Sequence, residues 1–183
     1  MFMSLKIFYL FYNFAHHSKF FDGLVFGVAQ YSNPWGIILA LLVLIIILIT
    51  HKDWKGKKFF EWTREVVIVG ISVASAYLVT LLLKIIVHAP RPFIALPNVH
   101  PLVIETPYDS FPSGHATAFF ALAVSMYMYD KKWGTVFFII AILVSLSRVI
   151  SGVHFPIDIL VGAIIGSLVA YSVHTLLVKK MRK

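Results

Sequence analysis

Long apolar runs constrain the fold of this 183-residue chain more than any other feature of its sequence. Residues 34–50 and 66–83 carry no charged side chain, and two later runs, 133–147 and 159–178, are equally free of charge. A helix that crosses a bilayer needs about 20 predominantly apolar residues, because it must pair all its backbone polar groups internally. With 60% hydrophobic residues and a mean hydropathy of +0.87, the chain is predicted to be an integral membrane protein.

Turn signals divide the sequence into five predicted membrane spans. Asn33-Pro34 favours a helix start, because proline is well tolerated at the first helical position. Pro90 and Pro92 end a later helix, and the proline-rich segment 93–112 is predicted to be an external loop. The predicted fold class is all-α, a polytopic membrane helical bundle. Its spans are expected at 34–50, 59–87, 113–129, 133–150 and 157–178.

Residues 1–32 differ from this predicted transmembrane core, which comprises residues 33–183. Their two apolar runs, 2–14 and 20–31, are shorter than the roughly 17–25 residues of a bilayer helix. Both runs are rich in Phe and Tyr, so they are predicted to form interfacial or re-entrant helices. No small-x-small cleavage site follows the first run, which argues against a secretory signal. The chain is therefore expected to form a single domain, 1–183.

The net charge of +8 is explained by three basic clusters rather than by a nucleic-acid surface. Eleven of the sixteen Lys and Arg residues fall in 52–64, 131–132 and 179–183, at predicted loops and the C-terminal tail. Basic loops mark the cytoplasmic side of a membrane protein. The C-terminus is therefore predicted to be cytoplasmic, and no nucleic-acid partner is expected. The chain has no cysteine, which excludes a thiolate metal site or nucleophile.

Three cations fall at the opposite membrane face. Lys84, Arg91 and Arg148 are expected near the ends of the second and fourth spans. Gathered in a low-dielectric site, they would repel one another unless they met an anion. A bound phosphate would balance them, because arginine offers paired donors and lysine a point charge to its oxygens. The protein itself offers only three carboxylates near this face, those of Glu105, Asp109 and Asp158.

The same face holds a histidine and an aspartate at helical spacing. His154 and Asp158 lie four residues apart, on one side of a helix if Pro156 opens it. Ionisable side chains at the end of a membrane helix indicate a functional site. If this is a functional site, the Asp158 carboxylate would hold the His154 imidazole in one tautomer. The alternative is that Arg148 and Asp158 are interfacial anchors and that His154 caps the next helix.

A second histidine follows a predicted helix start. Ser113 is a favourable N-cap, and Gly114 leaves the first backbone N–H groups open to an anion. His115 then falls in the first turn, beside the phosphate-binding cations. A histidine in that position suggests acid–base chemistry. The alternative is a capping or interfacial histidine.

Together these residues resemble the three-part signature of the type 2 phosphatidic acid phosphatase superfamily. These membrane lipid phosphatases share an active-site plan with the vanadium haloperoxidases. The resemblance spans residues 84–158. The three matching motifs, in order and spacing, are Lys84-x6-Arg91-Pro92, then Pro112-Ser113-Gly114-His115, then Ser147-Arg148-x5-His154-x3-Asp158.

The resemblance implies a fold and a set of roles. It implies a helical core like that of the haloperoxidases, without metal or other cofactor. His154 would be the nucleophile that forms a phosphohistidine, Asp158 its orienting carboxylate and His115 the general acid. The phosphate would be held by Lys84, Arg91, Ser113, Gly114 and Arg148.

The substrate is expected to be a membrane lipid phosphate or diphosphate. Asn13, Ala15-His16-His17-Ser18 and Asp22, ahead of the first span, are similar to the bacitracin-resistance type of undecaprenyl-diphosphate phosphatase. The resemblance thus implies recycling of the undecaprenyl carrier at the outer face of a bacterial plasma membrane. Phosphatidylglycerophosphate and lipid A phosphatases of the same superfamily are alternatives. A non-enzymatic anion channel or transporter is the alternative of another class.

Overall fold

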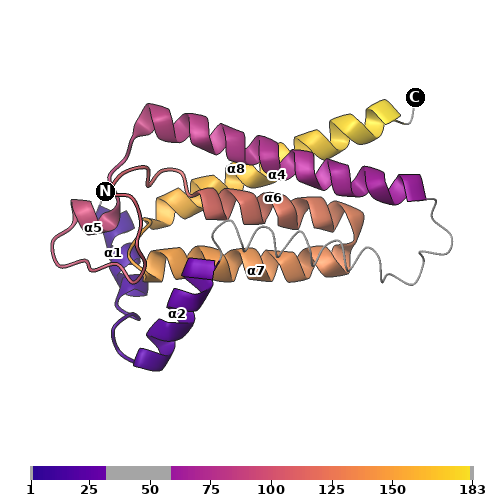
Figure 1. Ribbon diagram of the computed structural model, residues 1–183. Coiled ribbons are helices and arrows are strands. Elements are labelled where there is room, and N and C mark those ends of the chain that lie inside the picture. The colour runs from indigo at the N-terminus through magenta and orange to yellow at the C-terminus, as the bar shows by residue number, and fades with distance from the viewer. Residues whose placement is uncertain (1, 32–58, 182–183) are drawn as a thin grey trace.

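The computed structural model describes residues 2–31 and 59–181, which form helices and connecting loops without a β-strand (Figure 1). Four long helices lie side by side, and a long loop joins two of them at one end. The helices of the described residues are α1 (Phe2–Tyr12), α2 (Lys19–Tyr31), α4 (Phe59–Val87), α5 (Pro92–Ala95), α6 (Gly114–Tyr129), α7 (Lys131–Ile150) and α8 (Pro156–Met181).

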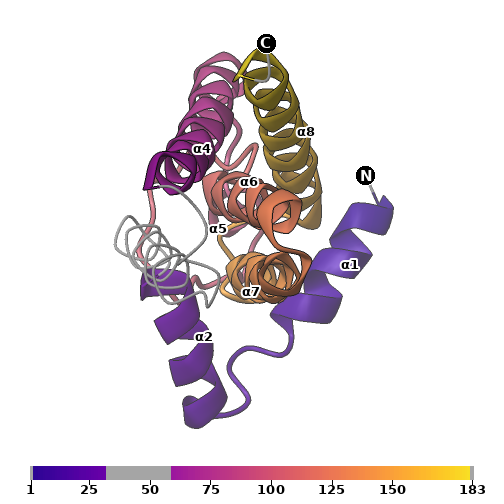
Figure 2. The ribbon, with the colours of Figure 1, turned by 90° about the vertical axis from the view of Figure 1, so that its right-hand side faces the viewer.

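Helix α6 forms the centre of the bundle. Viewed along the bundle axis, α4, α7 and α8 surround it (Figure 2). Its 16 residues carry no Asp, Glu, Lys or Arg, and alanines recur around the helix. Phe119, Leu122 and Met126 are buried and pack with Val73 of α4 and Phe137 of α7. A helix that is covered on all sides can be apolar all round, as this one is.

Two glycines let α8 approach α6 closely. A Cβ atom at Gly166 would lie 2.2 Å from the Thr117 carbonyl oxygen, and one at Gly162 would lie 2.7 Å from the Ser113 carbonyl oxygen. Only residues without a side chain fit at such a distance from a neighbouring backbone. Gly162 and Gly166 therefore give α8 a small-residue face that packs directly on the backbone of α6.

Side-chain caps define the helix starts near the ends of the bundle. Ser113 Oγ accepts a hydrogen bond of 3.5 Å from the Ala116 N–H, as expected for an N-cap. Asp130 Oδ1 accepts one of 3.0 Å from the Trp133 N–H. Because Asp130 is the cap, α7 begins at Lys131, two residues before the predicted start. The predicted bounds 59–87 agree with α4, and Pro156 opens α8 as predicted.

The surface of the bundle is apolar, as a membrane requires. Three helical segments of the described chain are long and apolar enough to cross a bilayer, Arg64–Val87, Lys131–Ile150 and Pro156–Val178. Large exposed apolar surfaces mark contact with lipid or another apolar partner, and the chain is an integral membrane protein. The prediction of five spans stays a prediction, because residues 34–50 lie outside the described residues. Exposed side chains include Leu78, Leu82, Ile85, Ile86, Ile139, Leu143, Leu160, Ile164 and Leu168.

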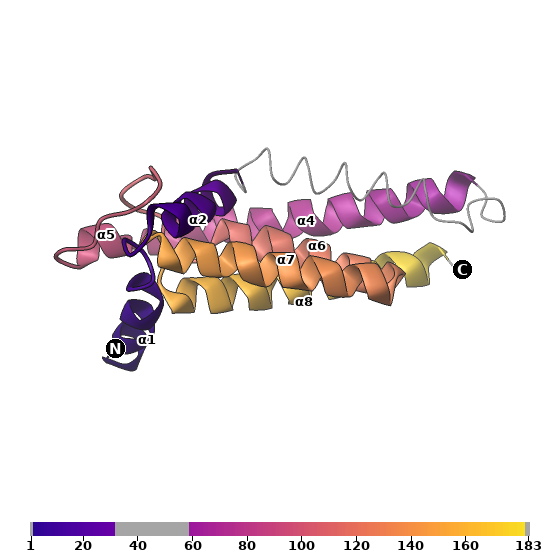
Figure 3. The ribbon, with the colours of Figure 1, turned by 90° about the horizontal axis from the view of Figure 1, so that it is seen from below.

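The two N-terminal runs are helical and lie at the loop end of the bundle, where α1 and α2 cross it (Figure 3). Phe8 and Tyr12 of α1 are buried against Val149 and Phe155. The Tyr12 hydroxyl also accepts a hydrogen bond of 2.8 Å from the His100 N–H. These contacts tie α1 to the loop and to the helix ends beside it. An interfacial position for both helices remains a prediction.

Candidate active site

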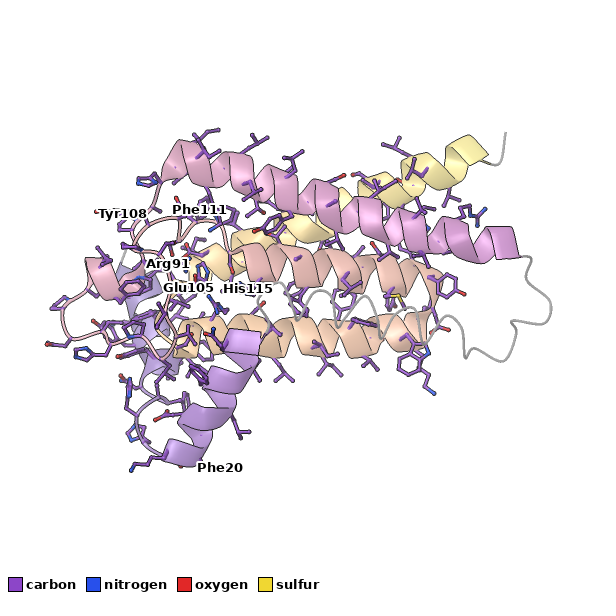
Figure 4. The ribbon with its side chains drawn as sticks, in the orientation of Figure 1. Phe20, Arg91, Glu105, Tyr108, Phe111 and His115 are labelled. Atoms are coloured by element: carbon purple, nitrogen blue, oxygen red, sulfur yellow. The ribbon has the colours of Figure 1, made fainter. Side chains whose placement is uncertain are left out.

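The loop end of the bundle brings together every site residue predicted from the sequence. Lys84 lies in the last turn of α4, Arg148 in that of α7, and Asp158 in the first turn of α8. Arg91, Glu105 and His115 lie close together at this end (Figure 4). The loop is held in place by backbone hydrogen bonds, such as Ser110 N–H to the Ala89 oxygen at 3.0 Å.

His154, Asp158 and Ser110 form a buried cluster. Asp158 Oδ2 lies 3.4 Å from His154 Nδ1. It also accepts hydrogen bonds from Ser110 Oγ, at 2.6 Å, and from the Phe155 N–H, at 2.8 Å. The Ser110 side chain is itself 3.4 Å from His154 Nδ1. The aspartate is thus fixed from two further directions and faces one nitrogen of the imidazole, as the four-residue spacing predicts.

The other imidazole nitrogen faces an arginine. Arg91 Nη1 lies 3.2 Å from His154 Nε2 and donates a hydrogen bond of 3.0 Å to the Val153 oxygen. Because a guanidinium can only donate, Nε2 must be the unprotonated nitrogen. In the neutral ring the proton is then on Nδ1, where Asp158 and Ser110 can accept it. The lone pair on His154 Nε2 therefore points toward Arg91.

Burial of His154, with the positive charges of Arg91, Arg148 and Lys84, holds the pKa of its imidazole well below the ordinary range. The side chain is only 2% exposed and lies in the loop between α7 and α8. Loss of water disfavours the charged form, and neighbouring cations act in the same direction. The imidazole is consequently neutral at neutral pH, which is the form that a nucleophilic role would require.

The two arginines share one carboxylate. Glu105 Oε2 is 3.2 Å from Arg91 Nη2, and Oε1 is ion-paired with Arg148 Nη2. Arg148 also donates a hydrogen bond of 2.9 Å to the Ala29 oxygen at the end of α2. The Nε atoms of both arginines are buried without a hydrogen-bond partner among the described residues. Each guanidinium thus retains a donor that a bound oxyanion could satisfy.

Lys84 and the start of α6 complete the group. Lys84 Nζ donates to the Asp109 carbonyl oxygen, and its charge, like those of Arg91 and Arg148, acts on both His115 and His154. The first N–H groups of a helix have no intrahelical acceptor. At the start of α6 these groups include that of Gly114, beside the Ser113 cap. This arrangement can bind a tetrahedral oxyanion through cations and backbone donors.

No group of three or more His, Cys, Asp or Glu side chains suited to a metal ion occurs in the described part of the chain. The prediction of a metal-independent site remains a prediction. Among the other histidines, His88 is exposed at the edge of the site. It lies 3.1 Å from Asp109 and stacks on the Tyr108 ring.

Two residues of this site were not assigned a role from the sequence. Ser110 precedes the Pro112–His115 motif by two positions, and a serine there could equally be a turn residue. Glu105 was noted only as one of the acidic groups near the cations. Both lie in the loop between α5 and α6, which returns over the helix ends. Their roles depend on long-range contacts, which local spacing does not reveal.

Comparison with known proteins gives a family match over most of the bundle. The PAP2 superfamily matches residues 65–182, which include all three motifs. The chain belongs to the PAP2 superfamily. It is therefore a membrane lipid phosphatase, as the motifs predict.

Several PAP2 relatives are similar to this chain. The undecaprenyl-diphosphatase BcrC of Bacillus subtilis is 25% identical over 92% of this chain and 81% of its own length. The undecaprenyl-diphosphatase of Sulfolobus acidocaldarius is 32% identical over 82% of this chain and 68% of its own. The bacitracin transport permease protein BcrC of Bacillus licheniformis is 40% identical, but the match spans only 44% of this chain and 39% of that protein.

A solved structure shows the same fold. The crystal structure of Aquifex aeolicus LpxE has a TM-score of 0.76 to this chain at 25% identity. The match covers 93% of this chain and 94% of LpxE. The all-helical PAP2 architecture predicted from the motifs is therefore confirmed.

Proposed function

We propose that this PAP2 member removes the terminal phosphate of undecaprenyl diphosphate through a phosphohistidine on His154. The observation that carries this proposal is the orientation of His154. Asp158 and Ser110 face Nδ1, so the lone pair on Nε2 points toward Arg91 and the other cations. A nucleophile whose reactive atom faces a cationic site suits attack on a phosphoryl group.

The reaction proceeds in two steps. Nε2 attacks phosphorus in line, and the bond from phosphorus to the leaving oxygen breaks. His115, which carries a proton once the negatively charged substrate offsets the neighbouring cations, protonates that oxygen. Water then attacks the phosphohistidine and gives its proton to His115, so that orthophosphate is released and neutral His154 and protonated His115 are regenerated. Lys84, Arg91 and Arg148 stabilise the negative charge on the equatorial oxygens throughout. Positioning and charge supply the catalysis, as is usual in phosphoryl transfer.

The diphosphate is favoured as substrate by two arguments. Two of the similar proteins are named undecaprenyl-diphosphatase. A diphosphate also has a phosphate as its leaving group, which needs less protonation than an alkoxide.

An apolar cavity of about 250 Å³ lies among α1, α6, α7 and α8 near the site, and residues such as Val149 and Pro156 line it. It offers an apolar surface to a long lipid tail.

The competing proposal is transport, which is favoured by the word permease in the name of one relative. A passage for anions could use the three cations, but it gives no role to Asp158 and Ser110 around His154. Phosphatidylglycerophosphate and lipid A phosphates remain alternative substrates of the same chemistry.

Purified protein should release orthophosphate from undecaprenyl diphosphate and leave undecaprenyl phosphate. Side-by-side kinetics in one detergent should give a higher kcat/KM for this substrate than for phosphatidylglycerophosphate or phosphatidic acid. A clear preference for phosphatidylglycerophosphate or a lipid A phosphate would reject the substrate but keep the chemistry. Absence of phosphate release, with transport in reconstituted vesicles, would favour the permease alternative.

The proposed location follows from the same charges that predict the topology. With the basic clusters in the cytoplasm, the active site faces the outside of a bacterial plasma membrane. There it would meet the diphosphate form of a lipid carrier released at the outer face.

A further inference from the structure

Glu105 lies where an oxyanion would be expected to bind. Its two carboxylate oxygens contact the guanidinium groups of two different arginines, Arg91 and Arg148. Those arginine side chains are 6% and 1% exposed, and the Glu105 side chain is 17% exposed. A phosphoryl group offers two oxygens to paired arginines in a similar way. The carboxylate and a substrate phosphate therefore compete for the same donors.

Each of the two arginines also has a backbone acceptor that does not involve Glu105. Arg91 Nη1 is held by the Val153 oxygen, and Arg148 Nη1 by the Ala29 oxygen. These backbone acceptors lie in the loop before α8 and near the end of α2. If Glu105 withdrew, both guanidinium groups would remain anchored. Their freed donors, together with the two unpaired Nε groups, would then be open to another anion.

The segment that carries Glu105 is anchored at both ends and exposed between them. Val103 is buried and anchors the segment on its N-terminal side. On the C-terminal side, the Pro107 oxygen accepts a hydrogen bond of 3.1 Å from the Arg91 N–H. Ile104, between these two anchors, is 96% exposed. A displacement limited to residues 104–106 would remove the carboxylate from the arginines without disturbing the helical core.

We propose that Glu105 occupies the phosphate position in the unliganded site and is exchanged for the phosphoryl group of the substrate. This inference rests on the proposed phosphatase function. It makes Glu105 a specificity-determining residue. An anion that brings no other contacts, such as the product orthophosphate, must displace the carboxylate using phosphate contacts alone. A lipid diphosphate has its tail and its second phosphate as further sources of binding energy.

Inhibition and binding by orthovanadate and orthophosphate test this exchange. The variant Glu105→Gln keeps the size of the side chain but loses the charge that competes for the arginines. The inhibition constants of both oxyanions should fall by about tenfold or more, because a charge-assisted contact no longer has to be broken. The stabilisation of the purified protein by orthovanadate, measured by thermal unfolding in detergent, should rise in parallel and does not depend on turnover.

Asp109→Asn is the matched control. Asp109 is the other acidic residue of this loop, and its contact with Lys84 uses the backbone carbonyl, which asparagine retains. Its carboxylate instead meets the exposed His88 at 3.1 Å. The same loss of one negative charge should therefore change the inhibition constants by less than about twofold, since exposed charges are screened.

Glu105→Ala is a second variant, which keeps the test possible if Glu105→Gln does not fold. It should also bind oxyanions more tightly than the wild type. Weaker oxyanion binding by the Glu105 variants would overturn the proposal and make Glu105 a positioning residue for the arginines. Equal tightening by Asp109→Asn would overturn it in favour of a general charge effect. If orthovanadate raised the Tm of neither the wild type nor the variants, the proposed phosphate site would be rejected, and this inference would be rejected with it.

Discussion

Ser110 and Asp158 lie 48 positions apart in the sequence, yet a hydrogen bond of 2.6 Å joins the serine hydroxyl to the aspartate carboxylate. This contact connects the loop before α6 to the first turn of α8. It also fixes the carboxylate that faces His154. His154, the proposed nucleophile, is therefore positioned by a residue outside the spacing of the third motif.

Replacing Ser110 with alanine should lower kcat by about tenfold to a hundredfold, since a hydrogen bond to a charged group contributes about 1.5–3 kcal/mol. KM should change little, because Ser110 does not contact the proposed phosphate position. Steady-state kinetics on the lipid substrate would measure both values. Ser125→Ala is the control, since that buried hydroxyl has no hydrogen-bond partner among the described residues. A rise in KM at unchanged kcat would contradict a positioning role.

The lowered pKa of His154 predicts how the site responds to acid. An ordinary histidine has a pKa of about 6.5. Because the pKa of His154 is lowered, its ring binds a proton only at a lower pH than that. The imidazole should therefore remain neutral at pH 6.5 and become protonated only below it. Histidine-selective carbon labelling and NMR would follow this titration in the substrate-free protein, and His154→Gln would identify the resonance. A midpoint at or above 6.5 would contradict the described environment.

The close contact between α6 and α8 predicts a steric effect at Gly166. Gly166→Ala would bring a Cβ atom within 2.2 Å of the Thr117 oxygen, and this backbone atom cannot move aside. The helices must then separate, and the loss of stability should be about 1–3 kcal/mol. Gly70→Ala in α4 is the control, because its Cβ would meet nothing within 4 Å. Thermal unfolding in detergent should show a lower Tm for the first variant only.

The membrane orientation can be measured because the chain has no native cysteine. Ile104→Cys would introduce a thiol in the loop over the site, where the side chain is 96% exposed. Lys131→Cys would introduce one in the basic turn before α7. An impermeant maleimide applied to intact cells should label the first variant and not the second. The reverse pattern would place the site on the cytoplasmic side.

The features of this site that the sequence predicted correctly depend on residues close together in the chain. Ser113 was predicted as an N-cap and His154 and Asp158 as a facing pair, because capping and four-residue spacing depend on neighbours in the sequence. The bounds of α4 followed from the apolar run and from the prolines after it. The start of α7 was predicted two residues late, because the capping role of Asp130 was not considered.

The contacts missed by sequence reasoning are those made by the loop between α5 and α6. The contacts of Ser110 with Asp158 and of Glu105 with the arginines depend on how that loop folds back over the bundle. The pattern of apolar and polar residues along the sequence does not predict the path of such a loop. The sequence did show that three cations require an anion. It did not show that the carboxylate of Glu105 could take that place.

The phosphohistidine on His154 is the central claim, and trapping it is the most direct measurement. The substrate for this experiment is a lipid diphosphate whose terminal phosphate is labelled. During turnover, the label should become attached to the wild-type protein through a bond that acid breaks. It should be absent from His154→Ala. It should still form on His115→Ala, because a phosphate leaving group depends less on a general acid, and it should then be hydrolysed slowly. Label retained on His154→Ala would contradict the assignment of His154 as the nucleophile.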